Sequence, residues 1–119
     1  MKMFSSVPDV FLYRDAVDFR KSINGLATIV EQQMQLSALN GSVYVFCNKS
    51  RDKLKILYWD NTGFALWYKR LEKDKFKWPT KLGKQSMNLS EQQLHWLLNG
   101  FDVLGHQAVS YQLLIYLLF

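Results

Sequence analysis

The chain has 119 residues, of which 49% are apolar, and a net charge of +5. This length suits one domain that buries its own core without disulfides or a structural metal. The single cysteine excludes a disulfide framework and a thiolate zinc site. No segment reaches the roughly 18 apolar residues that span a bilayer, and the N-terminus lacks the apolar core of a signal peptide. We therefore expect a cytoplasmic protein without a membrane partner.

The positive charge is concentrated in the middle of the chain. Residues 48–85 contain eleven lysines and arginines and four acidic residues, whereas the rest of the chain contains four basic and six acidic residues. A segregated charge favours a binding surface for an anionic partner such as nucleic acid. A solvated, lysine-rich edge that protects a strand from aggregation is the alternative.

The first half of the chain predicts a strand, a helix and a central strand. Residues 10–13 form a short apolar run. Over residues 19–34, apolar side chains recur at intervals of three and four, which indicates one face of a helix. Residues 43–47 are continuously apolar, as in the centre of a sheet. Gly25 falls inside the predicted helix, where a close contact with the sheet would explain it.

Two cations, Arg20 and Lys21, fall in the first turn of this predicted helix. The helix dipole disfavours positive charge there. Their position indicates an anion near the helix start, and two solvated side chains are the alternative.

Residues 53–59 and 64–71 predict a β-hairpin. A three-residue loop with Gly63 in the left-handed conformation is a favoured turn, and it pairs Asp60 with Phe64. In this register Lys55 lies opposite Lys69, a repulsion that an anion between them would relieve. The register predicts a core-like face (Leu54, Ile56, Tyr58, Phe64, Leu66, Tyr68) and a lysine–tryptophan face (Lys53, Lys55, Leu57, Trp59, Ala65, Trp67, Lys69, Leu71).

The second half predicts a short edge strand and a second helix. Residues 75–78 alternate between lysine and aromatic side chains and are followed by Pro79, which suits an edge strand. Residues 80–87 read as a basic loop. Ser90–Gln93 fits a capping box, and Gly100 fits the end of the helix.

The predicted fold is an α+β single domain over residues 1–102, with an antiparallel sheet of four to five strands and two main helices. One helix precedes the central hairpins and one follows them. Residues 103–119 form an apolar C-terminal tail that is too short to span a membrane.

No arrangement of residues indicates catalysis. His95 and His106 are isolated, and the acidic residues of the central region lie in or beside turns. We therefore expect no catalytic site, no cofactor and no metal. Lysines beside tryptophans on a sheet can neutralise phosphates and stack bases, while burial of the tryptophans against the helices is the alternative. The candidate nucleic-acid-binding residues are Arg20, Lys21, Arg51, Lys53, Lys55, Trp59, Trp67, Lys69, Lys75 and Lys77.

Several segments carry a family resemblance: FLY at 11–13, VDFRKS at 17–22, VFCNK at 45–49, KLKILYWD at 53–60, LWYKRLE at 66–72 and FKWP at 76–79. In order and spacing the chain resembles, over about residues 9–102, the TnpB (Orf-two-like) accessory proteins of insertion sequences of type sixty-six. The resemblance implies a small bacterial protein encoded beside the transposase, with strand-transfer chemistry assigned to a separate, larger subunit.

The sequence thus predicts a non-catalytic accessory factor for DNA transposition that binds nucleic acid. A protein adaptor for the transposase subunit without DNA contact is the alternative, and a small nuclease is a third reading. The expected partners are DNA and the transposase subunit of the same element, and homo-oligomerisation is left open.

Overall fold

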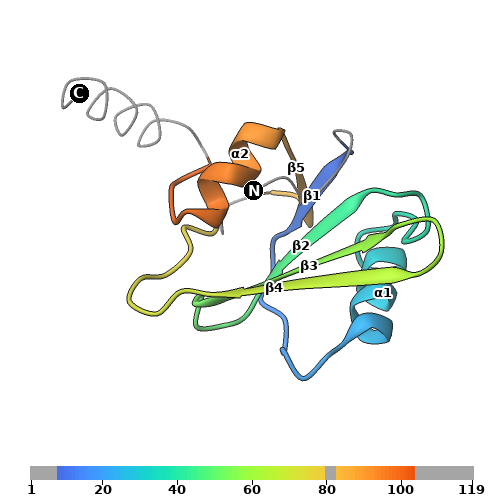
Figure 1. The fold of residues 1–119 in the computed structure, drawn as a ribbon, viewed down its shortest axis with the longest axis horizontal. Coiled ribbons are helices and arrows are strands. Elements are labelled where there is room, and N and C mark those ends of the chain that lie inside the picture. Colours follow the sequence, from blue (N-terminus) through green and yellow to red (C-terminus); the bar gives the residue numbers. More distant parts are fainter. Residues whose placement is uncertain (1–7, 80–82, 104–119) are drawn as a thin grey trace.

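A computed structural model describes residues 8–79 and 83–103, which form a five-stranded sheet and two helices (Figure 1). The strand order in the sheet is β4-β3-β2-β1-β5. This arrangement confirms the predicted α+β class and the number of strands. The elements are β1 (Val10–Tyr13), α1 (Ile23–Gln32), β2 (Val43–Cys47), β3 (Lys53–Trp59), β4 (Phe64–Arg70), β5 (Ser86–Leu89) and α2 (Glu91–Leu98).

The sheet is mixed, so the expectation of a purely antiparallel sheet was wrong for one pair of strands. β1 runs parallel to β2, and the remaining neighbours are antiparallel. The chain crosses from the end of β1 through α1 to the start of β2, and such a crossover makes the two strands parallel.

The outer strand beside β1 is β5, whose first two residues were predicted to belong to the loop at residues 80–87. β5 pairs with β1 from Val10↔Leu89 to Tyr13↔Ser86. The strand predicted at residues 75–78 is absent. Alternate side chains there do turn inward, because Phe76 and Trp78 are buried, but the backbone pairs with no strand. Alternating polar and apolar residues indicate which side chains are buried. An extended loop that packs on a core gives the same pattern as a strand.

Helix α1 begins at Ile23, four residues later than predicted. The carboxylate of Asp18 accepts a hydrogen bond from the backbone N–H of Arg20 (2.9 Å), and the carbonyl of Asp18 accepts one from Lys21 (3.0 Å). This local turn competes with a helical start. Arg20 and Lys21 therefore precede the helix. Gly25 approaches Lys21 and not the sheet, since a Cβ at Gly25 would lie 3.1 Å from Lys21 Cβ.

The register of the β3–β4 hairpin differs by one residue from the predicted one. Trp59 pairs with Phe64, and residues 60–63 form the loop, closed by the Asp60 N–H donating to the Gly63 carbonyl (3.0 Å). The left-handed residue is Asn61, with φ of 83°. Because side chains alternate along a strand, this slip moves every β4 side chain to the opposite face. The predicted pairing of Lys55 with Lys69 and both predicted faces were therefore wrong.

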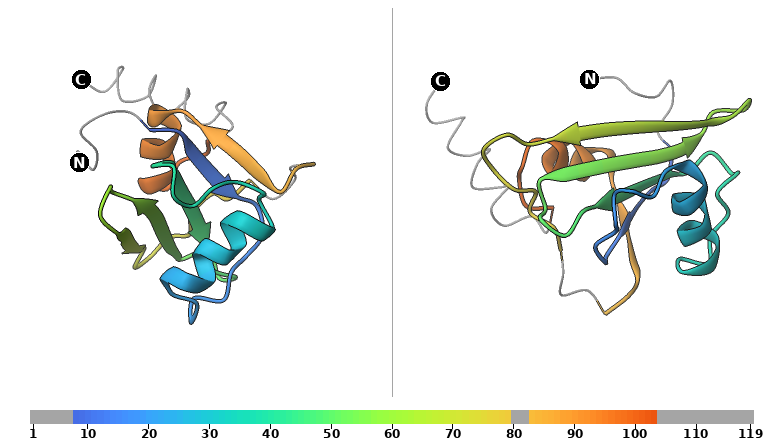
Figure 2. Two further views of the ribbon diagram at one scale, coloured as in Figure 1. Left: turned by 90° about the vertical axis from the view of Figure 1, so that its right-hand side faces the viewer. Right: turned by 90° about the horizontal axis from the view of Figure 1, so that it is seen from below.

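Each face of the sheet carries its own core, as the two helices on opposite sides indicate (Figure 2). On the α1 side, Tyr44, Phe46 and Leu57 pack with Leu26 and Val30 of the helix. The predicted apolar face of that helix is confirmed. On the α2 side, the sheet packs against α2 and against the part of the β4–β5 loop that contains Phe76 and Trp78, which we call the aromatic loop. The buried residues of this core are Val10, Leu12, Val43, Val45, Cys47, Leu54, Ile56, Phe76, Trp78, Leu89, Leu94, Leu97 and Leu98.

Helix α2 has the predicted capping box. The Ser90 hydroxyl accepts from the Gln93 N–H (3.1 Å), and the Gln93 side chain accepts from the Ser90 N–H (2.9 Å). Gly100 follows the helix with φ of 84°, a conformation that glycine adopts without strain. The predicted tail lies outside the described residues beyond Val103.

Candidate nucleic-acid interface

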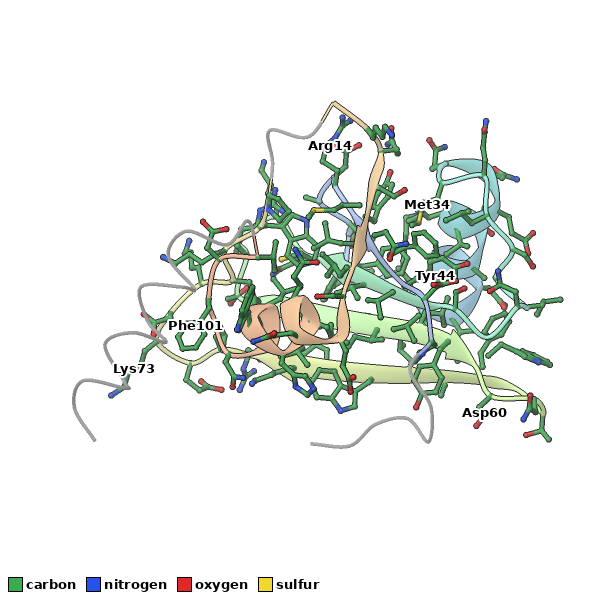
Figure 3. The ribbon with its side chains drawn as sticks, turned by 90° about the horizontal axis from the view of Figure 1, so that it is seen from above. Arg14, Met34, Tyr44, Asp60, Lys73 and Phe101 are labelled. Carbon is green, nitrogen blue, oxygen red and sulfur yellow. The ribbon has the colours of Figure 1, made fainter. Side chains whose placement is uncertain are left out.

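Basic side chains gather at one end of the sheet, where β2 ends, β3 begins and β4 ends. The turn after β2 is tied to the segment after β4: the Leu71 N–H donates to the Asp52 carbonyl (2.8 Å), and the Phe76 N–H donates to the Arg51 carbonyl (2.7 Å). Figure 3 shows Lys73 at this end and Asp60 at the opposite end. We call this group the basic end; it comprises Lys49, Arg51, Lys53, Arg70, Lys73, Lys75 and Lys77.

A third chain segment reaches the same end. The Val17 N–H donates to the carbonyl of Cys47, the last residue of β2 (2.9 Å). The segment that follows carries Arg20 and Lys21, which are exposed. The structure thus brings these two predicted residues towards the basic end, although some thirty positions separate them from it in the sequence.

Lys55 belongs to the packing of the fold more than to its surface. Its Nζ donates to the carbonyls of Phe19 and Lys21, at 3.0 Å each, and lies 4.8 Å from the centre of the Phe19 ring. Burial lowers the pKa of the Lys55 ammonium. Lys55 holds the segment before α1 against β3, and its hydrogen bonds compete with any phosphate contact.

Lys69 lies on the other face and has a similar structural task. Its Nζ donates to the carbonyl of Leu98, the last residue of α2 (2.7 Å). The final carbonyls of a helix have no partner within the helix, and a cation there also complements the dipole. Lys69 therefore ties β4 to the end of α2.

The two candidate stacking tryptophans lie on opposite faces of the sheet. Trp59 is at the hairpin end on the α1 side, where its ring meets Phe64 edge-on with 5.1 Å between centres. Trp67 packs against the α2-side core. Both are half-buried. The predicted lysine–tryptophan face does not form, because the four-residue loop sets a register in which Trp67 and Lys69 share a face with Ile56.

The sequence-predicted set lacks Lys49 and Lys73 of the basic end, and it also lacks Tyr68 and Arg70. In the observed register Tyr68 pairs with Lys55 and Arg70 with Lys53, all on the α1 side. The Tyr68 side chain is 48% exposed, and Arg70 is also exposed. The alternation of side chains along β4 separates Tyr68 and Arg70 from Trp67 and Lys69. The three-residue loop predicted for the hairpin assigned these two sets to the wrong faces.

Arg51 is an internal member of the basic end. It adopts φ of 64°, and its guanidinium carbon lies 6.0 Å from the centre of the Trp78 ring. Its Nη1 is buried and has no hydrogen-bond partner among the described residues. Beside it, burial raises the pKa of the Cys47 thiol to about 11, an effect that the Arg51 guanidinium partly opposes. Arg51 thus helps to hold the aromatic loop in place.

Two arginines considered for the interface, Arg20 and Arg70, form ion pairs. Arg20 binds Asp18 with 2.6 Å between Nη2 and Oδ2, and the hydrogen bonds from Arg20 lower the pKa of the Asp18 carboxyl to about 2. Arg70 binds Glu72 at 3.0 Å. By contrast, the exposed lysines of the basic end form no ion pair with any described residue; these are Lys49, Lys73, Lys75 and Lys77.

A polar hollow of about 220 Å³ lies beside Lys75 and Lys77. Asp74, Asn99 and Phe101 also line it. The two lysines therefore border a depression between the loop after β4 and the end of α2.

Residues 8–79 and 83–103 contain no group of three His, Cys, Asp or Glu side chains that could hold a metal ion. None of the helices in that part of the chain combines the length and the apolar character needed to cross a membrane. His95 is in α2, and His106 is outside the described residues.

Residues 8–108 match the family model described as IS66 Orf2 like protein. Two proteins of Sinorhizobium fredii (strain NBRC 101917 / NGR234) are similar to the chain. Protein y4hO is 33% identical over 93 residues, which cover 78% of this chain and 80% of y4hO. Protein y4jC is 34% identical over 86 residues, which cover 72% of this chain and 73% of y4jC. Both are described as uncharacterized. No solved structure matches the chain.

Proposed function

We propose that this chain, which belongs to the family of IS66 Orf2-like proteins, assists transposition by binding nucleic acid at its basic end, without itself catalysing a step. Family membership gives the chain a transposition-associated accessory role. The observation that carries the proposal is the convergence of exposed, unpaired lysines from the turn after β2 and the loop after β4 on one end of the sheet.

The chemistry of these lysines suits phosphate. An ammonium group that is not held by a carboxylate can replace the counterions of a nucleic-acid backbone, which makes binding favourable and dependent on salt. Lys75 and Lys77 alternate with the buried Phe76 and Trp78. Burial of these two rings holds the lysines on the outer side of the loop at fixed positions.

Tyr68 adds a contact with bases to this proposal. Its exposed ring lies on the α1 side of the sheet, in the strand position next to Arg70 on that face. An exposed aromatic ring beside cations is a platform on which an unpaired base can stack. In this proposal Tyr68 replaces Trp59 and Trp67 as the aromatic group of the interface.

Binding to a short duplex and to each of its single strands, measured by fluorescence anisotropy across a range of salt concentrations, tests the proposal. The affinity of the wild type falls steeply with salt. The triple variant Lys49→Glu, Lys75→Glu, Lys77→Glu loses most of this affinity and reduces the slope of log K against log salt by about 3, since each lost phosphate contact removes about 1.

The matched control compares two single charge reversals. Lys77→Glu and Lys84→Glu change the net charge equally, but exposed Lys84 precedes β5, at the edge of the sheet farthest from β4. Only Lys77→Glu is expected to weaken binding. Equal loss in both variants would show that net charge alone drives binding, and no binding of the wild type at low salt would favour the adaptor role.

A further inference from the structure

The outer edge of β4 lacks a partner strand among residues 8–79 and 83–103. β4 is a terminal strand of seven residues, and within the described parts of the chain no strand pairs with its outer side. Natural sheets protect long edges with lysines, prolines or bulges. β4 has a continuous ladder with β3, contains no proline, and carries its charges only at its end, on Lys69 and Arg70. Lys69 is already bonded to Leu98.

The hydrogen bonds at the two ends of the hairpin show which backbone groups face outward. Asp60 bonds to Gly63, and Leu71 bonds to Asp52. Residues that exchange hydrogen bonds with the neighbouring strand alternate with residues that do not. The backbone N–H and C=O groups that point away from β3 are therefore those of Phe64, Leu66, Tyr68 and Arg70.

We propose that a second copy of this chain pairs its β4 antiparallel to this edge, about a two-fold axis at Trp67. In this register Leu66 exchanges hydrogen bonds with Tyr68 of the second copy, and Phe64 does so with Arg70. The outward groups of all four residues are satisfied, and all seven positions of the strand are paired. The result is one continuous sheet across two molecules.

The edge is complementary to itself in charge. Lys69 lies opposite Ala65 of the second copy, Arg70 lies opposite Phe64, and Trp67 lies opposite its own equivalent, so no like charges are opposed. Centring the axis on Lys69 or Arg70 would oppose like charges and pair fewer residues. A two-fold contact uses the same surface twice, which this strand satisfies by itself.

Dimerisation does not depend on the proposed function, but it affects the geometry of that function. A two-fold axis normal to the sheet keeps the α1 sides of both copies on one side. The two Arg70 positions are then separated by six residues along the strands, or about 20 Å. The dimer presents two basic ends on one face.

Sedimentation velocity of the full chain over about two orders of magnitude of concentration tests the pairing. The wild type is expected to form a dimer. Tyr68→Pro removes an outward N–H and leaves the bonds to β3 intact, so the association constant falls at least tenfold. Tyr68→Ala, which keeps that N–H, still dimerises. Circular dichroism and thermal melting check that each variant is folded.

Three results would overturn the proposal: a monomeric wild type at every concentration, undiminished dimerisation of folded Tyr68→Pro, or equal loss in Tyr68→Ala and Tyr68→Pro. The last result would assign the contact to the tyrosine side chain. A monomeric wild type would leave the edge for a strand of another protein, such as the transposase.

Two substitutions of opposite charge at Ala65 test the register of the dimer without introducing a proline. Ala65→Lys opposes Lys69 of the second copy and is expected to weaken the dimer at least tenfold relative to Ala65→Glu, which places an acid there. The two variants change a half-buried alanine into longer, charged side chains. Equal association of both variants would overturn the register centred on Trp67.

Discussion

The two faces of the β3–β4 hairpin differ although the same two strands build both. On the α2 side, Leu54, Ile56 and Trp67 pack in a core that the aromatic loop closes. On the α1 side, Leu57 is buried near the helix, while Tyr68 and Arg70 are exposed to solvent. Each face receives one helix, but the α2 side has a second cover in Phe76 and Trp78.

The difference in cover between the two faces decides whether a lysine bonds to the backbone of the fold. Lys69 meets the end of a helix and bonds to it. Lys53, one strand away on the other face, forms no side-chain hydrogen bond or ion pair with the described residues. Lys55 is an intermediate case, because the segment before α1 supplies two carbonyls to it. Charge in the sequence is therefore not equivalent to charge available for binding.

The largest effect is expected from removing the second cover. Trp78→Ala deletes a buried ring whose Nε1 donates to the Tyr13 carbonyl (3.0 Å), and it is expected to lower the free energy of unfolding by about 3–5 kcal/mol. Trp78→Phe keeps most of the buried area and loses the hydrogen bond, so it is expected to cost about 1 kcal/mol. Urea denaturation measures both. A small effect of Trp78→Ala would show that the loop is not part of the α2-side core.

A smaller effect on stability is expected for lysines that bond to backbone carbonyls, and it distinguishes them from Lys53. Lys69→Met and Lys55→Met each remove donors from backbone carbonyls and are expected to lower the free energy of unfolding by about 1–2 kcal/mol. Lys53→Met is the control, with a change within about 0.5 kcal/mol.

For nucleic-acid binding, Lys53→Met is expected to have a larger effect than Lys69→Met. Lys53→Met reduces the salt slope by about 1, while Lys69→Met leaves it unchanged. If Lys69→Met reduced the slope as Lys53→Met does, the distinction between the two faces would be wrong.

The smallest effect concerns the loop that sets the faces. Asn61 has a left-handed backbone, so Asn61→Ala is expected to cost about 1 kcal/mol. Gly63 lies outside that region and has open space around it, so Gly63→Ala is expected to change stability by less than about 0.5 kcal/mol. Thermal denaturation compares the two. If Gly63→Ala cost more stability than Asn61→Ala, the result would support the three-residue loop and with it the lysine–tryptophan face.

Local signals in the sequence predicted most elements correctly. Local patterns located β1, β2 and β3 and the whole of β4, which was predicted one residue too long. The serine–glutamine box located the start of α2. These signals depend on neighbouring residues, so they can be read from a single sequence. The start of α1 was placed too early because the apolar period includes Phe19. The turn made by Asp18 occupies the residues before Ile23, so the helix begins only there.

The candidate site was predicted less well. Four members of the basic end, Arg51, Lys53, Lys75 and Lys77, were named from the sequence. Lys49, Arg70 and Lys73 were not named, and neither was Tyr68. One extra residue in the hairpin loop exchanged the faces of β4, and a favoured three-residue loop was indistinguishable in sequence from the observed one.

By itself, the sequence determined the class of fold, the strands of the hairpin, the cap of α2 and the segregation of positive charge. Only the tertiary structure decided that β1 and β2 are parallel and that β5 forms the second edge. It also decided that Lys55 and Lys69 bond to backbone carbonyls, while Lys49, Lys73, Lys75 and Lys77 are exposed. The physical reason is that pairing and solvent exposure depend on contacts between residues far apart in the chain, which no local pattern specifies.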